Sequence, residues 1–155
     1  MNDNEKFFHL VTFEMNGEMF AIPIMNIQEI IRWTQVVPIP QSPGFVEGVI
    51  NLRNKVIPVV SLKKKFGVAA EKATDEKTRI VIAEIGDLVV GFIVDNVHEV
   101  LRIDKAAFEE TPSIAVAENR RCVKGIVKQD KEMVMVLWLE ELFSAEEKGI
   151  LGRVN

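Results

Sequence analysis

The chain has 155 residues and a net charge of −4, and its apolar residues make up 48% of the total. This length and composition fit about one domain, whose core needs no disulfide or metal to stabilise it. The chain contains no apolar run near the roughly 18 residues of a membrane helix, and its acidic balance argues against a nucleic-acid binder.

The first residues contain acidic and amide side chains where a secretory signal peptide would be basic and then apolar. The single cysteine, Cys122, cannot form a disulfide within the chain. We therefore expect a soluble protein in the cytoplasm.

The predicted elements begin with two strands, at 8–15 and 19–22, which alternate apolar and polar residues around Asn16-Gly17. A short connecting segment at 24–31 follows. Two further strands flank a turn at Arg53-Asn54-Lys55. The same order then recurs, with strands at 79–85 and 88–94 around Gly86-Asp87, a connecting segment at 94–101, and strands on either side of a turn at 129–132.

This recurrence indicates an internal duplication. Residues 46–67 align without a gap on residues 123–144 at an offset of 77, so that Gly48 meets Gly125. Residues 24–31 align on residues 94–101. Each half of the chain is therefore predicted to form the same small unit.

We predict an all-β fold with a minor helix, because short strands that curl into small barrels avoid exposed sheet edges. The whole chain, 1–155, would form one domain with two sub-barrels at about 8–67 and 79–144, joined by a polar loop. Helical spacing of apolar residues predicts a C-terminal helix at about 139–150. A groove between the sub-barrels would be the place where a partner binds.

A search for chemistry-bearing patterns finds no catalytic site, no cofactor site and no metal site. His9, His98 and Cys122 do not have the spacing of a zinc site. The serines do not lie in a nucleophile elbow, and a Gly-rich phosphate loop is lacking. The sequence therefore favours a binding protein over an enzyme.

Several motifs in this order resemble the CheW family of chemotaxis coupling proteins. They are FAIPIMNIQEII at 20–31, PxxPxFVxGVINLR at 40–53, VIPVVSL at 56–62 with KKFG after it, and VxGFIVDxVxEVL at 89–101. The resemblance covers residues 8–145. It implies two five-stranded Src-homology-3-like barrels.

Members of this family are adaptors without catalytic activity, so the resemblance implies the same function for this chain. It would couple the cytoplasmic tip of transmembrane chemoreceptors to the regulatory domain of the histidine kinase CheA. The resemblance implies a monomer in solution that joins signalling arrays at the inner face of the membrane. It does not imply a cofactor, a nucleic-acid partner or insertion into the membrane.

By matching motif positions, the resemblance places a receptor-binding groove at Ile27, Glu29 and Arg53, with Gly48 allowing a close backbone approach beneath them. The kinase would contact the second half of the chain. Ile114, the predicted kinase-binding residue on the long connection 102–122, would reach a further CheA or CheW neighbour in the array.

Some of these residues also have an interpretation within the fold. Ile27 could belong to the core, and Arg53 could be a solvated turn residue. Arg53, however, aligns on Asp130 in the other repeat. Because the two repeats differ at this position while the residues around it stay similar, we interpret Arg53 as a residue that binds a partner.

Two residues depart from the family pattern: Asn54 stands where a glycine is usual, and Trp138 stands where an acidic residue is common. A left-handed asparagine can replace the glycine. Trp138 could anchor a partner or cap the core, and the sequence leaves both open.

Two other functions are weighed against this one. The chain could serve as a scaffold in another CheA-type pathway that controls motility or gene regulation. It could also bind nucleic acid or catalyse a reaction through Lys63–Lys65 or Cys122, although the lysines lack interleaved aromatic residues.

Overall fold

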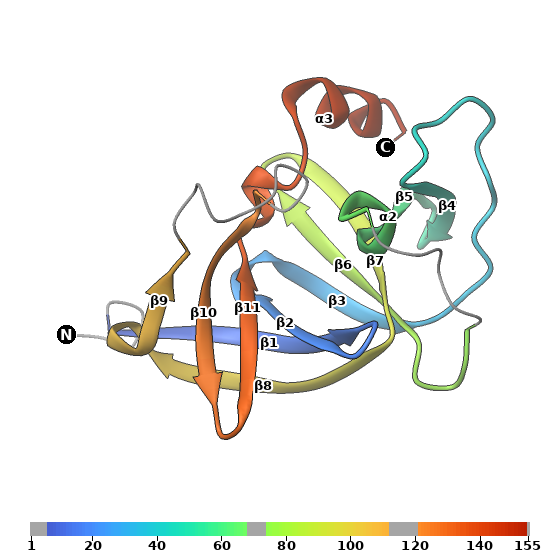
Figure 1. Cartoon of the computed structure of the whole chain (residues 1–155). Helices are drawn as coiled ribbons and strands as arrows, with labels where there is room; N and C mark the ends of the chain where they lie inside the picture. Colours follow the sequence, from blue (N-terminus) through green and yellow to red (C-terminus); the bar gives the residue numbers. More distant parts are fainter. Residues whose placement is uncertain (1–5, 68–73, 112–120, 155) are drawn as a thin grey trace.

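The chain is described from a computed structural model, which defines residues 6–67, 74–111 and 121–154. Most of these residues form β-strands (Figure 1). The strands are β1 (Phe7–Met15), β2 (Glu18–Pro23), β3 (Ile27–Arg32), β4 (Val46–Leu52), β5 (Lys55–Ser61), β6 (Arg79–Ile85), β7 (Leu88–Val94), β8 (Asn96–Asp104), β9 (Phe108–Glu110), β10 (Val123–Gln129) and β11 (Glu132–Leu137).

Short helical segments connect or follow the strands. Within the described residues these are the 3-10 turns η1 (Ile24–Asn26), η2 (Lys105–Ala107) and η5 (Leu139–Glu141) and the α-helices α2 (Leu62–Lys65) and α3 (Ala145–Gly152). In the described parts of the chain, helices long and apolar enough to cross a membrane do not occur.

The strands form two sheets. Sheet A has the order β8-β1-β2-β11-β10-β9, and sheet B has the order β3-β6-β7-β5-β4. The prediction of a mostly β protein with two small β units and a C-terminal helix is confirmed. Sheet B has the five predicted strands, whereas sheet A gains a sixth, the three-residue β9, within the long connection of the second half.

The predicted division into sub-barrels at 8–67 and 79–144 is wrong, because each sheet combines strands from both halves of the sequence. The hairpin β1-β2 belongs to the first half, yet β1 pairs with β8 and β2 pairs with β11. Likewise β6 pairs with β3, and β7 pairs with β5. The first hairpin of each half has therefore exchanged places with that of the other half.

Sheet A curls around on itself. Its two edge strands, β8 and β9, are joined by only the three residues of η2. Four backbone steps reach about 14 Å, whereas the edges of a flat six-stranded sheet lie about 24 Å apart. The curling brings these edges together.

Sheet B closes in a different way. After β3 the chain crosses to the other edge of the sheet, where Val37 pairs with Val49 of β4. Two backbone hydrogen bonds of 2.9 Å join these residues.

Three apolar cores follow from this arrangement. One lies within sheet A and includes Leu10, Leu101, Val127 and Val136. A second lies within sheet B and includes Ile50, Val59, Ile80 and Ile82. The third and largest lies between the sheets and draws on both of them, with Phe13, Phe20, Val60, Val81, Phe92, Leu137 and Phe143 among its members.

Two aligned glycines allow a neighbouring segment to pass close to a strand. Gly48 lies at a register shift in the β4-β5 pair, where a Cβ would come within 2.1 Å of the Val37 carbonyl oxygen. Gly125 lies at the matching shift in β10-β11, where a Cβ would come within 2.3 Å of the Phe108 ring. Both halves have kept glycine because any side chain here would collide with the crossing segment.

The C-terminal helix begins later than the predicted residue 139. Residues Leu139–Glu141 form the 3-10 turn η5, and Ser144 has extended backbone angles, which separate that turn from α3. Ser144 then caps α3: its hydroxyl accepts from the Glu147 amide, and the Glu147 carboxylate accepts from the Ser144 amide.

Candidate functional site

Two of the predicted receptor-binding residues, Glu29 and Arg53, meet in an ion pair. Arg53 donates two hydrogen bonds of 2.6 Å, one to each carboxylate oxygen of Glu29. Such bidentate pairing fixes the plane of the guanidinium group. The Arg53 side chain is 72% exposed and that of Glu29 is 26% exposed, so this oriented charge pair faces the solvent.

The ion pair shifts the titration of both groups. The hydrogen bonds from Arg53 are the main cause that lowers the pKa of Glu29 below 4.5; partial burial opposes this shift and the Arg53 charge adds to it. The same hydrogen bonds raise the pKa of Arg53. Both groups are therefore charged at neutral pH.

Backbone conformation presents Arg53 at the tip of the β4-β5 hairpin. Arg53 and Asn54 both have positive φ, 50° and 67°, as a two-residue turn of type I′ requires. The Asn51 side chain accepts a 3.1 Å hydrogen bond from the Asn54 amide. The prediction that Asn54 can take the left-handed conformation is thus confirmed.

Ile27, the third predicted receptor-binding residue, is partly buried and packs against the core between the sheets. It pairs with Ala83 of β6 just before a register shift in β3. In this structure Ile27 therefore contributes to the core, the interpretation that the sequence left open.

Gly48 makes its close approach to Val37 and Pro38. It allows the segment after β3 to cross β4. Its surroundings therefore give it a role in closing sheet B, and the predicted role beneath the binding residues remains a prediction. Ile114 lies outside the described residues.

Three exposed apolar side chains that sequence reasoning missed lie on η1 and β3. They are Ile24, Met25 and Ile30, which are 39%, 88% and 37% exposed; we call them the η1–β3 strip. A signal for them was present in the sequence, because Ile30 and Ile31 place apolar residues on both faces of one strand. Ile24 and Met25 are adjacent on η1, and Ile30 lies on the strand that follows, so this segment is a candidate binding surface.

The strip and Glu29 lie on or next to β3, and Arg53 reaches Glu29 from the β4-β5 hairpin at the other edge of sheet B. β3 is an edge strand, and Ile30 pairs with Val81 while Glu29 pairs with Ile82. Successive side chains of a strand point to opposite faces. Glu29 and Ile30 therefore flank the two sides of β3.

Trp138 caps the core of sheet A. Its ring stacks on Phe108 at a centroid distance of 5.9 Å and meets Phe8 edge-on at 5.9 Å. It packs as a partly buried residue against that core. Of the two possibilities that the sequence left open for Trp138, the structure supports the core cap.

The lysine run does not form an unpaired basic patch. Lys63 pairs with Asp95 at 2.9 Å, Lys64 with Glu47 at 2.7 Å and Lys65 with Glu147 at 2.6 Å. Because carboxylates neutralise all three charges, this run lacks the excess positive charge that a nucleic-acid surface needs.

Residues with possible catalytic chemistry are dispersed. Cys122 is 2% exposed within the core, and His98 contacts Glu14 at 3.2 Å on the surface. Among residues 6–67, 74–111 and 121–154, groups of three or more His, Cys, Asp or Glu that could hold a metal are not found.

Residues 9–147 match the family model described as a CheW-like domain. The chain belongs to the CheW family. It is 35% identical to the chemotaxis protein CheW of Helicobacter pylori, an alignment that covers 93% of this chain and 86% of that protein. It is 34% identical to the chemotaxis protein CheW of Thermotoga maritima, with 90% of each protein covered.

A solved structure of a CheW-family protein has the same fold. It is the scaffolding protein TtCheW from Thermoanaerobacter tengcongensis, which superposes with a TM-score of 0.80 at 36% identity. The match covers 90% of this chain and 94% of that one. The CheW fold assigned from the sequence motifs is therefore confirmed over nearly the whole chain.

Proposed function

We propose that this chain is a chemotaxis adaptor without catalytic activity, which couples chemoreceptors to the histidine kinase CheA. The observation that supports it most directly is the match of residues 9–147 to the CheW-like domain. Relatives that carry the name chemotaxis protein CheW align over about nine tenths of the chain.

The receptor would bind along the β3 edge of sheet B. The tip of a chemoreceptor is a helical hairpin, and a helix docks through a row of apolar residues flanked by charges. The η1–β3 strip offers exposed apolar side chains and the Arg53–Glu29 pair offers an oriented charge, on the two faces of the edge strand β3. A helix that docks along this edge would reach both. Arginine is also among the residues enriched in interface hot spots.

CheA would bind a separate surface, in the second half of the sequence, so that both partners can be held at once. Ile114 is assigned to this contact by its place in the family pattern. Binding of both partners would place the protein in the cytoplasm, at the inner face of the membrane within receptor arrays.

Binding measurements with the full-length chain test this function. We expect the chain to bind a receptor hairpin fragment and the CheA regulatory domain, each alone and both together. Arg53→Glu should weaken the receptor complex and leave the CheA complex unchanged, because only the receptor contact uses this charge. If the parent chain binds neither partner, the proposed function is wrong.

A further inference from the structure

Asp95 is the single residue at which the chain passes from sheet B to sheet A. It lies between the end of β7 at Val94 and the start of β8 at Asn96. Its amide donates a 2.9 Å hydrogen bond to the Glu14 carbonyl of β1. Its Oδ2 accepts a 2.8 Å hydrogen bond from the Asn16 amide in the β1-β2 turn. Asp95 is thus attached to sheet A at two points.

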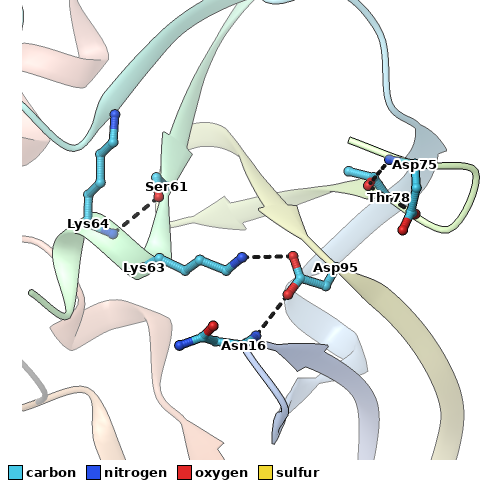
Figure 2. A network of polar contacts seen from close by, with 7 residues as sticks. All are labelled: Asn16, Ser61, Lys63, Lys64, Asp75, Thr78 and Asp95. Atoms are coloured by element: carbon cyan, nitrogen blue, oxygen red, sulfur yellow. Dashed lines mark hydrogen bonds and ion pairs between the residues drawn. The ribbon is translucent and has the colours of Figure 1, made fainter. Parts of the chain in front are cut away.

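The other carboxylate oxygen of Asp95 binds a residue that follows sheet B. Lys63, on α2 directly after β5, donates a 2.9 Å hydrogen bond to Oδ1 (Figure 2). The two side chains are 3% and 8% exposed. Figure 2 shows one carboxylate oxygen of Asp95 bonded to Lys63 and the other to the Asn16 amide. This buried ion pair therefore joins the two sheets.

The duplication supplies a second junction for comparison. Asp95 aligns on Met25, and Lys63 aligns on Glu140. At that junction the neighbouring Asn26 donates hydrogen bonds of 3.2 Å to the Glu84 carbonyl and 3.3 Å to the Glu140 carboxylate, both exposed. Met25 itself is 88% exposed. Of the two aligned junctions, the one at Asp95 has a buried ion pair, and the one at Met25 has exposed hydrogen bonds from Asn26 instead.

Stability alone does not explain a buried ion pair. Taking two charges out of water costs about as much as their attraction returns, and well-packed apolar replacements are often neutral or stabilising. In some proteins, buried polar or ionic groups instead specify a unique arrangement of the packed elements. The apolar core between the sheets is non-directional, so it restricts their relative rotation less than a fixed hydrogen bond does.

We infer that Lys63 and Asp95 are positioning residues, which fix the orientation of sheet A relative to sheet B. The inference has a second part, which rests on the proposed function that one chain bridges the receptor and CheA. In that function, the pair sets the angle between the receptor-binding edge and the kinase-binding surface. Neither residue needs to touch a partner for this effect.

The double variant Lys63→Met/Asp95→Asn isolates the link between the sheets. It removes one positive and one negative charge, while the introduced amide oxygen can still accept from the Asn16 amide. The matched control is Lys65→Met/Glu147→Gln, which makes the same charge change at a pair that joins α2 to α3. Glutamine also preserves the capping box of α3.

Residual dipolar couplings of backbone amides measure the orientation without any partner. In the parent and in the control, one alignment tensor should fit amides from both sheets. In Lys63→Met/Asp95→Asn, each sheet should fit a tensor of its own, while the thermal midpoint stays close to that of the parent. One shared tensor with the parental orientation would overturn the inference.

Should the double variant not fold, Asp95→Glu serves as the second test, because it keeps the charge and displaces the carboxylate by one methylene. We expect a measurable rotation between the sheets. An orientation identical to that of the parent would overturn the inference in this case too.

Binding provides the functional readout. In Lys63→Met/Asp95→Asn, assembly of the complex with both partners should weaken by about tenfold, while each single-partner affinity changes by less than about twofold, because bridging depends on geometry. Parental assembly would refute the extension to bridging. Failure of the parent to bind either partner would contradict the proposed function and leave the orientation result standing.

Discussion

The two junctions between the sheets descend from one sequence pattern and now differ in chemistry. At one, Asp95 is buried and ion-paired with Lys63. At the other, the aligned residue Met25 is 88% exposed, beside Ile24 on η1. One copy of this junction therefore carries a buried ion pair, and the other exposes apolar side chains.

The same division holds for the two charge pairs. Lys63–Asp95 is buried between the sheets, whereas Arg53–Glu29 joins the tip of the β4-β5 hairpin to β3 at the surface. A buried charge without its partner is costly, and an exposed one is not. Position therefore determines whether an ion pair serves the fold or remains available for recognition.

Removing one buried partner should have the largest effect. Asp95→Ala removes the carboxylate that the buried Lys63 ammonium binds and should lower the free energy of unfolding by about 3–5 kcal/mol. Met25→Ala, at the aligned position, should change it by less than about 0.5 kcal/mol. Urea denaturation of both variants measures the difference. Equal losses would show that the two junctions have not diverged.

Gly48→Ala should be the next most severe change. The new Cβ would lie 2.1 Å from the Val37 oxygen, at a φ of +148°, which should cost about 3 kcal/mol through overpacking and backbone strain. The same change at Gly149, where a Cβ meets open space in α3, should be neutral or stabilising by up to about 1 kcal/mol. Parental stability of Gly48→Ala would refute its role in closing sheet B.

Arg53→Glu should affect binding and not folding. We expect its affinity for a receptor hairpin fragment to fall by at least about 30-fold, the range of a reversed hot-spot charge. Its thermal midpoint should move by less than about 2 °C, because an exposed pair contributes little to stability. Asp130→Lys at the aligned turn is the control and should bind as the parent does. Early melting of Arg53→Glu would assign the residue to the fold instead.

The smallest effect concerns the titration of Glu29. Because the hydrogen bonds from Arg53 lower the pKa of Glu29, the pair should persist at neutral pH and break only as the pH falls through this lowered pKa. In Arg53→Ala the pKa of Glu29 should rise toward 4.5. Carboxyl NMR titration measures it, and an unchanged pKa would show that the pair does not form in solution.

Much of the local structure could be predicted from the sequence, because local rules determine it. The hairpin turns followed from residues that tolerate positive φ, such as Asn16 and Asn54. The aligned glycines, Gly48 and Gly125, followed from the repeat. The pairing of whole hairpins could not be predicted, because β1-β2 buries the same faces whether it joins strands of its own half or of the other.

The site was predicted only in part, for a related reason. Glu29 and Arg53 came from the family motifs, and the structure brings them together. Lys63 belongs to a run of three lysines, which looks like a basic surface until the fold shows that each is paired. Asp95 gave no signal by itself, because its role depends on two sheets that meet only in the folded chain.

The adaptor function is tested most directly by reconstituting three components and measuring CheA autophosphorylation. We expect receptor fragments to change the kinase rate only when this chain is present. Arg53→Glu should abolish that control without unfolding. Two results would contradict the account. In the first, receptor fragments control CheA equally well when the chain is omitted. In the second, control needs the chain, but Arg53→Glu supports it as well as the parent does.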